Sequence, residues 1–242
     1  MADLQVHMFS ALGDNYGFLI HDADAGVTAS IDTPEEGPIR AALAETGWTL
    51  THILNTHHHA DHTQGNLPLK ADFGCTIVGP KPEEAKIPGI DIALDEGDTF
   101  DFGGHVATVY HTPGHTLGHI VYHFADDGIC FAGDTLFPLG CGRVFEGTMD
   151  QMWSSMEKMA ALPLETVVYS AHEYTQANAR FAVTAEPDNQ ALAARAAEID
   201  ALRAAGKPTV PTTMAVEMET NPFVRAGSAA RFAEVRTAKD NF

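Results

Sequence analysis

A cluster of potential metal ligands follows directly after a short apolar segment. Residues 51–55 form that segment, and the chain continues Thr-His-His-His-Ala-Asp-His over 56–62. In an extended chain residues two apart point the same way, so His57 and His59 can converge on one ion. Asp61 and His62 can turn toward a second ion if the chain tightens into a helix there. Imidazole and carboxylate suit Zn, Fe(II) or Mn. The pattern predicts a metal centre at the end of a strand.

Three later segments can supply the remaining ligands. The Gly- and Pro-containing loop 111–119 offers His111, His115 and His119, Asp134 follows an apolar run, and His172 follows another. Each is a ligand type at the end of an expected strand, where layered α/β folds present their chemistry. A loose His-rich tract is the alternative interpretation of residues 57–62. The ordered spacing and the matching distal residues argue against that alternative.

Apolar runs and turn residues predict strands through most of the chain and helices at its end. The expected strands are Leu4–Phe9, Gly17–His21, Val27–Asp32, Thr51–Asn55, Cys75–Gly79, Val106–Tyr110, Ile120–Phe124, Ile129–Ala132 and Thr166–Ser170. The expected helices are Pro38–Thr46, Met149–Ala161, Gln176–Thr184, Gln190–Ala205 and Ala229–Lys239. We therefore expect a layered α/β domain followed by a smaller helical domain.

The charge divides unevenly along the chain. The 242 residues include 33 acidic and 14 basic side chains, for a net charge of -19. Residues 1–174 carry 25 acidic and 6 basic side chains and all 13 histidines, whereas residues 175–242 carry 8 of each charge. This shift predicts a domain boundary at residue 174. An acidic excess argues against nucleic acid and anionic membrane as partners.

Cysteine usage and the N-terminal residues predict a cytoplasmic protein. Cys75, Cys130 and Cys141 are too few and too scattered for a disulfide framework. The first 20 residues lack a basic region followed by a long apolar one, and no apolar run approaches the roughly 18 residues of a membrane span. We expect free thiols and a monomer.

The metal motifs resemble those of the metallo-β-lactamase superfamily across residues 1–174. The resemblance implies a four-layer αββα sandwich with two divalent metal ions, zinc being favoured and iron or manganese possible. It implies that one metal is held by His57, His59 and His115, and the other by Asp61, His62 and His172. Asp134 would bridge the two.

Later segments resemble glyoxalase II, the hydroxyacylglutathione hydrolases, within that superfamily. These segments are Gly140–Thr148, Asn221–Arg225 and Arg236–Asp240. The resemblance implies that glutathione contacts Arg143, Phe145, Tyr174, Arg236 and Lys239. Arg143 and Phe145 stand where the family pattern has Lys and Tyr; arginine keeps the cation as a planar fork of donors, and phenylalanine has no hydroxyl.

The expected activity is therefore hydrolysis of glutathione thioesters, with S-D-lactoylglutathione as the favoured substrate, by a hydroxide that bridges two metals. Asp134 and Asp61 are the expected catalytic carboxylates. A mononuclear-iron persulfide dioxygenase and a non-catalytic metal-binding module are the alternatives. A β-lactamase would be expected to carry a signal peptide, and a nuclease of this fold would need a basic face.

Overall fold

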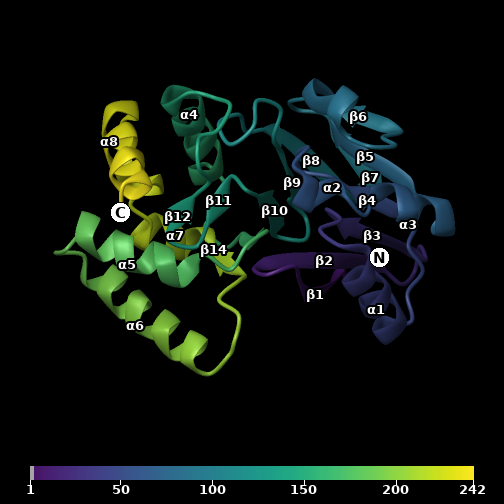
Figure 1. Ribbon diagram of the computed structural model, residues 1–242, viewed down its shortest axis with the longest axis horizontal. Coiled ribbons are helices and arrows are strands. Elements are labelled where there is room, and N and C mark those ends of the chain that lie inside the picture. The colour runs from purple at the N-terminus through teal and green to yellow at the C-terminus, as the bar shows by residue number, and fades with distance from the viewer. Residues whose placement is uncertain (1–2) are drawn as a thin grey trace. The chain divides into compact units, whose positions relative to one another are not determined.

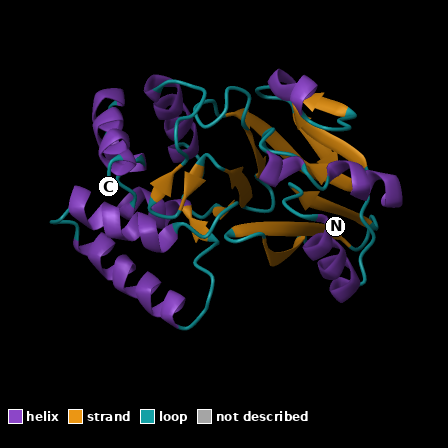
Figure 2. Cartoon of the chain, in the orientation of Figure 1, coloured by secondary structure: helices purple, strands orange, loops and turns teal. Residues whose placement is uncertain are grey.

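The computed structural model describes residues 3–242 in two compact units. The first unit comprises the residues up to His111 together with Gly118–Phe131, and the second comprises Thr112–Leu117 together with Ala132–Phe242. Among the described residues, no helix has the length and apolar character needed to cross a membrane. Figures 1 and 2 show the elements of each unit, with strands prevailing in the first unit and helices in the second.

The first unit begins with a six-stranded sheet whose strands lie in sequence order. β1, β2 and β3 pair antiparallel, and β3 to β6 pair parallel. The strands are β1 (Gln5–Ala11), β2 (Asn15–Asp22), β3 (Val27–Ile31), β4 (His52–Leu54), β5 (Thr76–Pro80) and β6 (Ile92–Leu94). Parallel neighbours need crossover connections, which here contain the helices of this unit.

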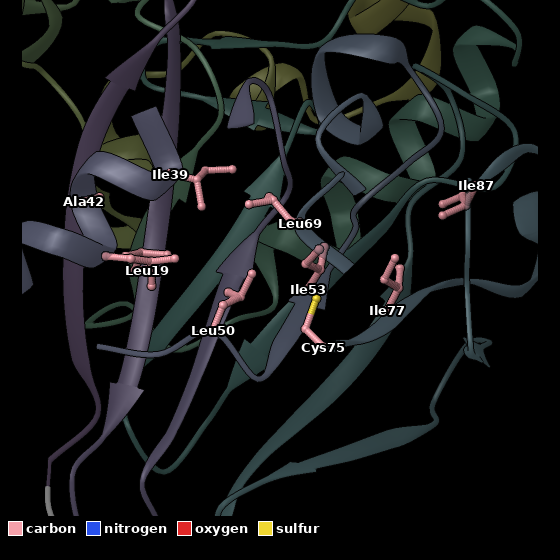
Figure 3. Close-up of a cluster of buried hydrophobic side chains, with 10 residues drawn as sticks. Leu19, Ile39, Ala42, Leu50, Ile53, Leu69, Cys75, Ile77 and Ile87 are labelled. Atoms are coloured by element: carbon pink, nitrogen blue, oxygen red, sulfur yellow. The ribbon is translucent and has the colours of Figure 1, made fainter. Parts of the chain in front are cut away.

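Those helices are α1 (Glu36–Thr46), α2 (Ala60–Thr63), α3 (Asn66–Phe73) and the 3-10 helix η1 (Lys81–Lys86). α1 ends where Gly47 adopts a left-handed conformation and its amide donates to the carbonyl of Leu43. Figure 3 shows Ile39 of α1 and Leu69 of α3 directed toward side chains from β2, β4 and β5. The cluster also contains Leu19, Ala42, Leu43, Leu50, Ile53, Cys75, Ile77 and Ile87. Each large apolar side chain buried there contributes about 1.5–3 kcal/mol.

The first unit also contains the antiparallel strands β7 (Thr99–Phe102), β8 (His105–His111), β9 (Ile120–Phe124) and most of β10 (Ile129–Gly133). They pair in the order β10-β9-β8-β7. Phe131 of β10 packs against Phe18 of the first sheet, with ring centroids 5.7 Å apart, and against Phe124 of β9. The two sheets therefore share an aromatic core.

The second unit contains the last two residues of β10, the hairpin β11–β12, the pair β13–β14 and all the remaining helices. The strands are β11 (Leu136–Phe137), β12 (Gly140–Cys141), β13 (Val167–Ser170) and β14 (Thr212–Thr213). The helices are α4 (Met149–Ala160), α5 (Thr175–Ala185), α6 (Gln190–Ala204), α7 (Met214–Thr220), the 3-10 helix η2 (Val224–Ala226) and α8 (Ala229–Asp240). α5 and α6 pack through Leu139, Ala179, Ala182, Leu192 and Ile199.

Every strand and helix expected from the sequence is present, with ends that differ by a few residues. Residues 120–124 match their expected range, and α2 forms where a tightening of the chain after His59 was anticipated. The elements that were not expected are mostly short. They are α3, η1, β6, β7, β11, β12, β14, α7 and η2. The predicted boundary at residue 174 remains a prediction.

The buried side chain of His105 contacts two aspartates that lie at other turns of the first unit. His105 at the start of β8 is 3% exposed, and its Nε2 lies 2.7 Å from Asp22 while its Nδ1 lies 2.8 Å from Asp127. Burial alone lowers the pKa of His105, but the hydrogen bonds to Asp127 and Asp22 outweigh burial and raise it. The hydrogen bond from the Ala25 amide, followed by that from His105, lowers the pKa of Asp22 despite burial.

We expect His105→Asn to lower the melting temperature by roughly 5–10 °C near pH 6, since it leaves two carboxylates without their shared cation. Because the folded pKa of His105 is raised, its stabilisation is complete below the ordinary value of 6.5 and is lost as pH rises through the folded pKa. Melting curves from pH 5 to 9 should therefore converge for the two proteins at high pH. His7→Asn, which alters a ring packed on Trp48, is the control. A pH-independent difference for His105→Asn would contradict the ionic role.

Candidate metal centre

Parallel strands β3, β4 and β5 end at one edge of the first sheet, and polar residues follow each of them. Asp32 follows β3, the segment Asn55–Thr56–His57 follows β4, and Glu83 follows β5. The carboxyl ends of parallel strands are where α/β sheets present their chemistry. The ligand-rich segment 56–62 therefore begins at this edge of the sheet.

His57 and His59 direct ring nitrogens at one another. His57 Nε2 and His59 Nδ1 lie 3.0 Å apart, and His57 is fully buried. Two nitrogens bound to one tetrahedral zinc at the usual Zn–N length would lie about 3.3 Å apart. The observed separation therefore fits two ligands that share one ion.

Asp32 orients two of the histidines. Its carboxylate accepts hydrogen bonds from the Thr56 amide at 2.7 Å and the Thr56 hydroxyl at 2.8 Å, and lies 2.8 Å from His62 Nδ1. Since the hydroxyl proton of Thr56 goes to Asp32, its oxygen accepts from His57 Nδ1 at 3.0 Å. Both imidazoles thus carry their proton on Nδ1 and keep Nε2 available for a metal, an orientation that outer carboxylates commonly impose.

Asp61 lies beside His62 in the short helix α2. His62 Nε2 and Asp61 Oδ2 are 3.5 Å apart, again a distance suited to two ligands of one ion. Asn15 of β2 donates to the same Asp61 oxygen at 3.2 Å. The position of Asp61 is therefore determined both by its helix α2 and by the hydrogen bond from β2.

The second unit contains the other three predicted ligands, and two of them, His115 and His172, lie beside the carboxylate of the third, Asp134. Asp134 Oδ2 lies 3.2 Å from His115 Nε2, and Asp134 Oδ1 lies 3.4 Å from His172 Nε2. All three side chains are buried. His115 Nδ1 lies 2.9 Å from the carbonyl of Arg143, to which it donates, so Nε2 is kept for coordination. One carboxylate that faces two imidazoles through different oxygens has the geometry expected of a bridging ligand.

The donor chemistry fits a divalent metal site. Each of the seven side chains belongs to a His and Asp group able to hold a metal ion. Neutral imidazoles with carboxylates are ligands for Zn, Fe and Mn alike, so the donors do not select one metal.

The expected glutathione contacts all lie in the second unit, in different settings. Tyr174 stacks on His172 with ring centroids 4.7 Å apart, and Phe145, which is 61% exposed, packs near His115. Arg143 Nε lies 3.6 Å from Asp240, and its Cζ lies 5.7 Å from the centre of the Phe145 ring. Phe145 and Tyr174 therefore flank the ligand histidines of this unit, and Arg143 packs on Phe145.

Arg236 and Lys239 of α8 are more constrained than their positions in the sequence indicate. Arg236 is 6% exposed, donates to the carbonyl of Cys141 at 3.0 Å and pairs with Asp240 at 2.9 Å. Lys239 donates to the carbonyl of Ala177. Burial, followed by the charges of Arg236 and Arg180, lowers the pKa of Lys239.

Cys141 has no features of a nucleophile. Its thiol is buried, and burial raises its pKa to about 11. A thiol with that pKa is almost entirely protonated near neutral pH.

Comparison with known proteins decides the family. Residues 23–172 match the model of the metallo-beta-lactamase superfamily, and residues 173–242 match that of the hydroxyacylglutathione hydrolase C-terminus. A hydroxyacylglutathione hydrolase of Rhizobium meliloti (strain 1021) is 55% identical over 256 residues, covering 100% of both chains. The chain belongs to the hydroxyacylglutathione hydrolases. It is thus a member of the metallo-β-lactamase superfamily.

Solved structures agree with the metallo-β-lactamase fold. ETHE1 from Myxococcus xanthus aligns with a TM-score of 0.74 and 28% identity, covering 96% of this chain and 90% of that one. BLEG-1 B3 metallo-beta-lactamase aligns with a TM-score of 0.70 and 19% identity, covering 91% and 99%. At that identity the second match shows the fold alone. The expected fold, a metallo-β-lactamase sandwich with a helical C-terminal domain, is confirmed for this hydroxyacylglutathione hydrolase family member.

Sequence reasoning missed Asp32, Asn15 and Glu83. Glu83 is 2% exposed and accepts hydrogen bonds from the amides of His58 and Gly118. Of these three residues, only Asp32 could have been found from the sequence. It is a carboxylate at the end of an expected strand, and such a residue lies near the end of the neighbouring parallel strand. Asn15 and Glu83 are brought to the ligands by tertiary structure.

We expect Asp32→Asn to weaken metal binding about 10–100-fold, because the new amide would face the donors of Thr56 and His62 and disturb the His62 tautomer. Metal affinity is measured by titrating apoprotein with zinc, and folding by circular dichroism. Asp22→Asn alters a buried carboxylate bonded to His105 instead, and should change stability with little change in zinc affinity. A folded Asp32→Asn protein with unchanged zinc affinity would contradict the orienting role of Asp32.

Proposed function

We propose that this protein hydrolyses glutathione thioesters, with S-D-lactoylglutathione as the substrate and D-lactate and glutathione as products. The observation that carries the proposal is the bond between His115 Nδ1 and the backbone carbonyl of Arg143. One residue thereby orients a ligand histidine through its backbone and offers a cation to an anionic substrate through its side chain. Relatives of this protein that are named hydroxyacylglutathione hydrolase support hydrolysis of a glutathione thioester.

The proposed centre takes two divalent metals, zinc being favoured and iron or manganese possible. His57, His59 and His115 would hold the first, Asp61, His62 and His172 the second, and Asp134 would bridge them. This proposal is supported by the ligand spacings within each unit and by the superfamily model, whose matched residues 23–172 include all seven positions.

When bound, such metals lower the pKa of a water molecule to near neutrality and polarise the carbonyl of the substrate. Asp134 and Asp61 would supply negative charge to the metals, with Asp61 oriented by Asn15 and Asp134 by its contacts with His115 and His172. The leaving thiolate has a parent pKa of about 8.5, so it departs without a dedicated general acid. The protonated Cys141 takes no part in bond formation.

Substrate binding is assigned to Arg143, Phe145, Tyr174, Arg236 and Lys239. An anionic glutathione moiety needs local cations on a chain with a net charge of -19. Arg143 is the most accessible of the three cations, since its side chain is 59% exposed. Phe145 and Tyr174 offer ring faces beside His115 and His172.

A cytoplasmic monomer completes the proposal. Cys75, Cys130 and Cys141 are buried free thiols, as expected in a reducing compartment. A mononuclear-iron persulfide dioxygenase and a non-catalytic metal-binding module have less support, because residues 173–242 match the hydroxyacylglutathione hydrolase C-terminus.

We expect the purified protein to hydrolyse S-D-lactoylglutathione, to lose that activity on treatment with a chelator, and to regain it when zinc, iron or manganese is restored. Loss of absorbance of the thioester measures the rate, and elemental analysis measures metal per chain. Two metals per chain with turnover would support the dinuclear assignment. Turnover that survives complete metal removal would rule out the proposed mechanism, and one iron with oxygen consumption would favour the dioxygenase.

We expect Arg143→Gln to raise KM for the glutathione thioester about 3–10-fold, the size expected for losing one largely exposed charged contact, with a much smaller effect on kcat. Arg231→Gln removes an exposed cation from α8 that pairs with Glu234, and should leave KM unchanged. If both variants raise KM equally, the effect belongs to overall charge and not to a contact made by Arg143.

A further inference from the structure

The β11–β12 hairpin connects the proposed bridging ligand to the proposed substrate cation. Asp134 lies two residues before β11, and Arg143 lies two residues after β12. Gly142 donates to the carbonyl of Thr135, and a Cβ on Gly142 would lie only 2.0 Å from the carbonyl oxygen of Asp134. Any shift of the hairpin would therefore move both Asp134 and Arg143.

The turn of this hairpin is strained. Leu139 has a φ of +57°, in the left-handed region that non-glycine residues seldom adopt, and its side chain is fully buried. Such a conformation persists only when the surroundings hold it in place.

Side chains from the C-terminal helices hold every residue of the turn. Asn221, directly after α7, donates to the carbonyls of Phe137 at 3.1 Å and Gly140 at 2.9 Å. Asn178 of α5 donates to the carbonyl of Pro138 at 3.2 Å. Glu217 of α7 accepts from the strained Leu139 amide at 2.8 Å. The turn is thus bonded at four successive residues.

Glu217 and Asn221 form the centre of this network. Both are fully buried, and Asn221 also donates to Glu217 at 2.9 Å while the Thr212 hydroxyl donates to the other Glu217 oxygen at 2.7 Å. Burial raises the pKa of Glu217, although these donors oppose the shift. A buried carboxyl group is costly unless its hydrogen bonds are satisfied, and Leu139, Thr212 and Asn221 satisfy those of Glu217.

We propose that Glu217 and Asn221 are positioning residues for thioester hydrolysis: by holding Leu139 in its left-handed conformation they keep Asp134 and Arg143 in their working positions. This inference rests on the proposed function. It assigns to the C-terminal helices a second role beyond contact with glutathione, which is to maintain a loop that bears a metal ligand.

The test compares three variants. Glu217→Leu removes the acceptor for Leu139. Glu217→Gln is the conservative control, because its amide oxygen can face Leu139 and Asn221 while its amide nitrogen donates to the Thr212 hydroxyl. In the double variant Glu217→Leu/Leu139→Gly, glycine adopts a positive φ without strain and no longer needs the bond.

For Glu217→Leu we expect faster hydrogen exchange at the Leu139 amide, less zinc per folded chain, a higher KM and a kcat lower by about 10–100-fold. Glu217→Gln should remain near wild type, and the double variant should regain most of the lost metal and activity. A role limited to stability would reduce the amount of folded protein while leaving KM and zinc per folded chain unchanged, which would overturn the proposal.

Asn221→Ala decides the question if Glu217→Leu does not fold, since it removes the two carbonyl contacts and keeps Glu217. We expect it to show faster hydrogen exchange at the amides of Phe137, Leu139 and Gly140 and the same loss of zinc; wild-type values for both would overturn the proposal. Failure of the proposed function is distinguishable, because wild-type protein would then hydrolyse no glutathione thioester while the exchange and zinc measurements still report on Glu217 and Asn221.

Discussion

The site in the first unit depends on burying the carboxylate of Asp32 with all its hydrogen bonds made. An unpaired buried carboxylate would be strongly unfavourable. Asp32 is 4% exposed and adopts a positive φ of 56°, yet the amide and hydroxyl of Thr56 and the ring of His62 satisfy it. The same bonds determine which nitrogen of each histidine can meet a metal. The side chain of Asp32 therefore links the end of β3 to the residues that follow β4, and it helps to set the tautomers of His57 and His62. Its hydrogen bonds also support its own left-handed backbone conformation.

In the second unit, the buried carboxylate of Asp134 is positioned next to the β11–β12 hairpin. Asp134 meets His115 and His172, and its own backbone lies against Gly142. Here the support comes from residues far along the chain: Leu139 bonds to Glu217 across 78 residues, and Cys141 bonds to Arg236 across 95. The neutral C-terminal residues therefore contribute polar side chains to a buried loop as well as cations to an acidic protein.

Local patterns could predict much of this molecule and could not predict the rest, for identifiable reasons. His57, His59, Asp61 and His62 share one short segment, so their spacing alone indicated a metal site. The ends of expected strands also pointed to Asp134 and His172, the resemblance selected His115 from the three histidines of its loop, and each unit brings its own members together. The two-residue strands of the β11–β12 hairpin carry no periodicity, and exist because distant side chains hold them.

Arg236 shows what spacing alone leaves open. Its place three residues before Lys239 puts both cations on one side of α8, which is equally typical of a solvated face, and only the resemblance implied contact with substrate. In the structure its guanidinium is nearly buried, rests on the Phe223 ring and donates to Cys141. Its charge is paired with Asp240, which also lies 3.6 Å from Arg143. Of the three cations proposed to meet substrate, Arg143 therefore offers the most accessible charge, and Arg236 also contacts the strand β12 that precedes Arg143.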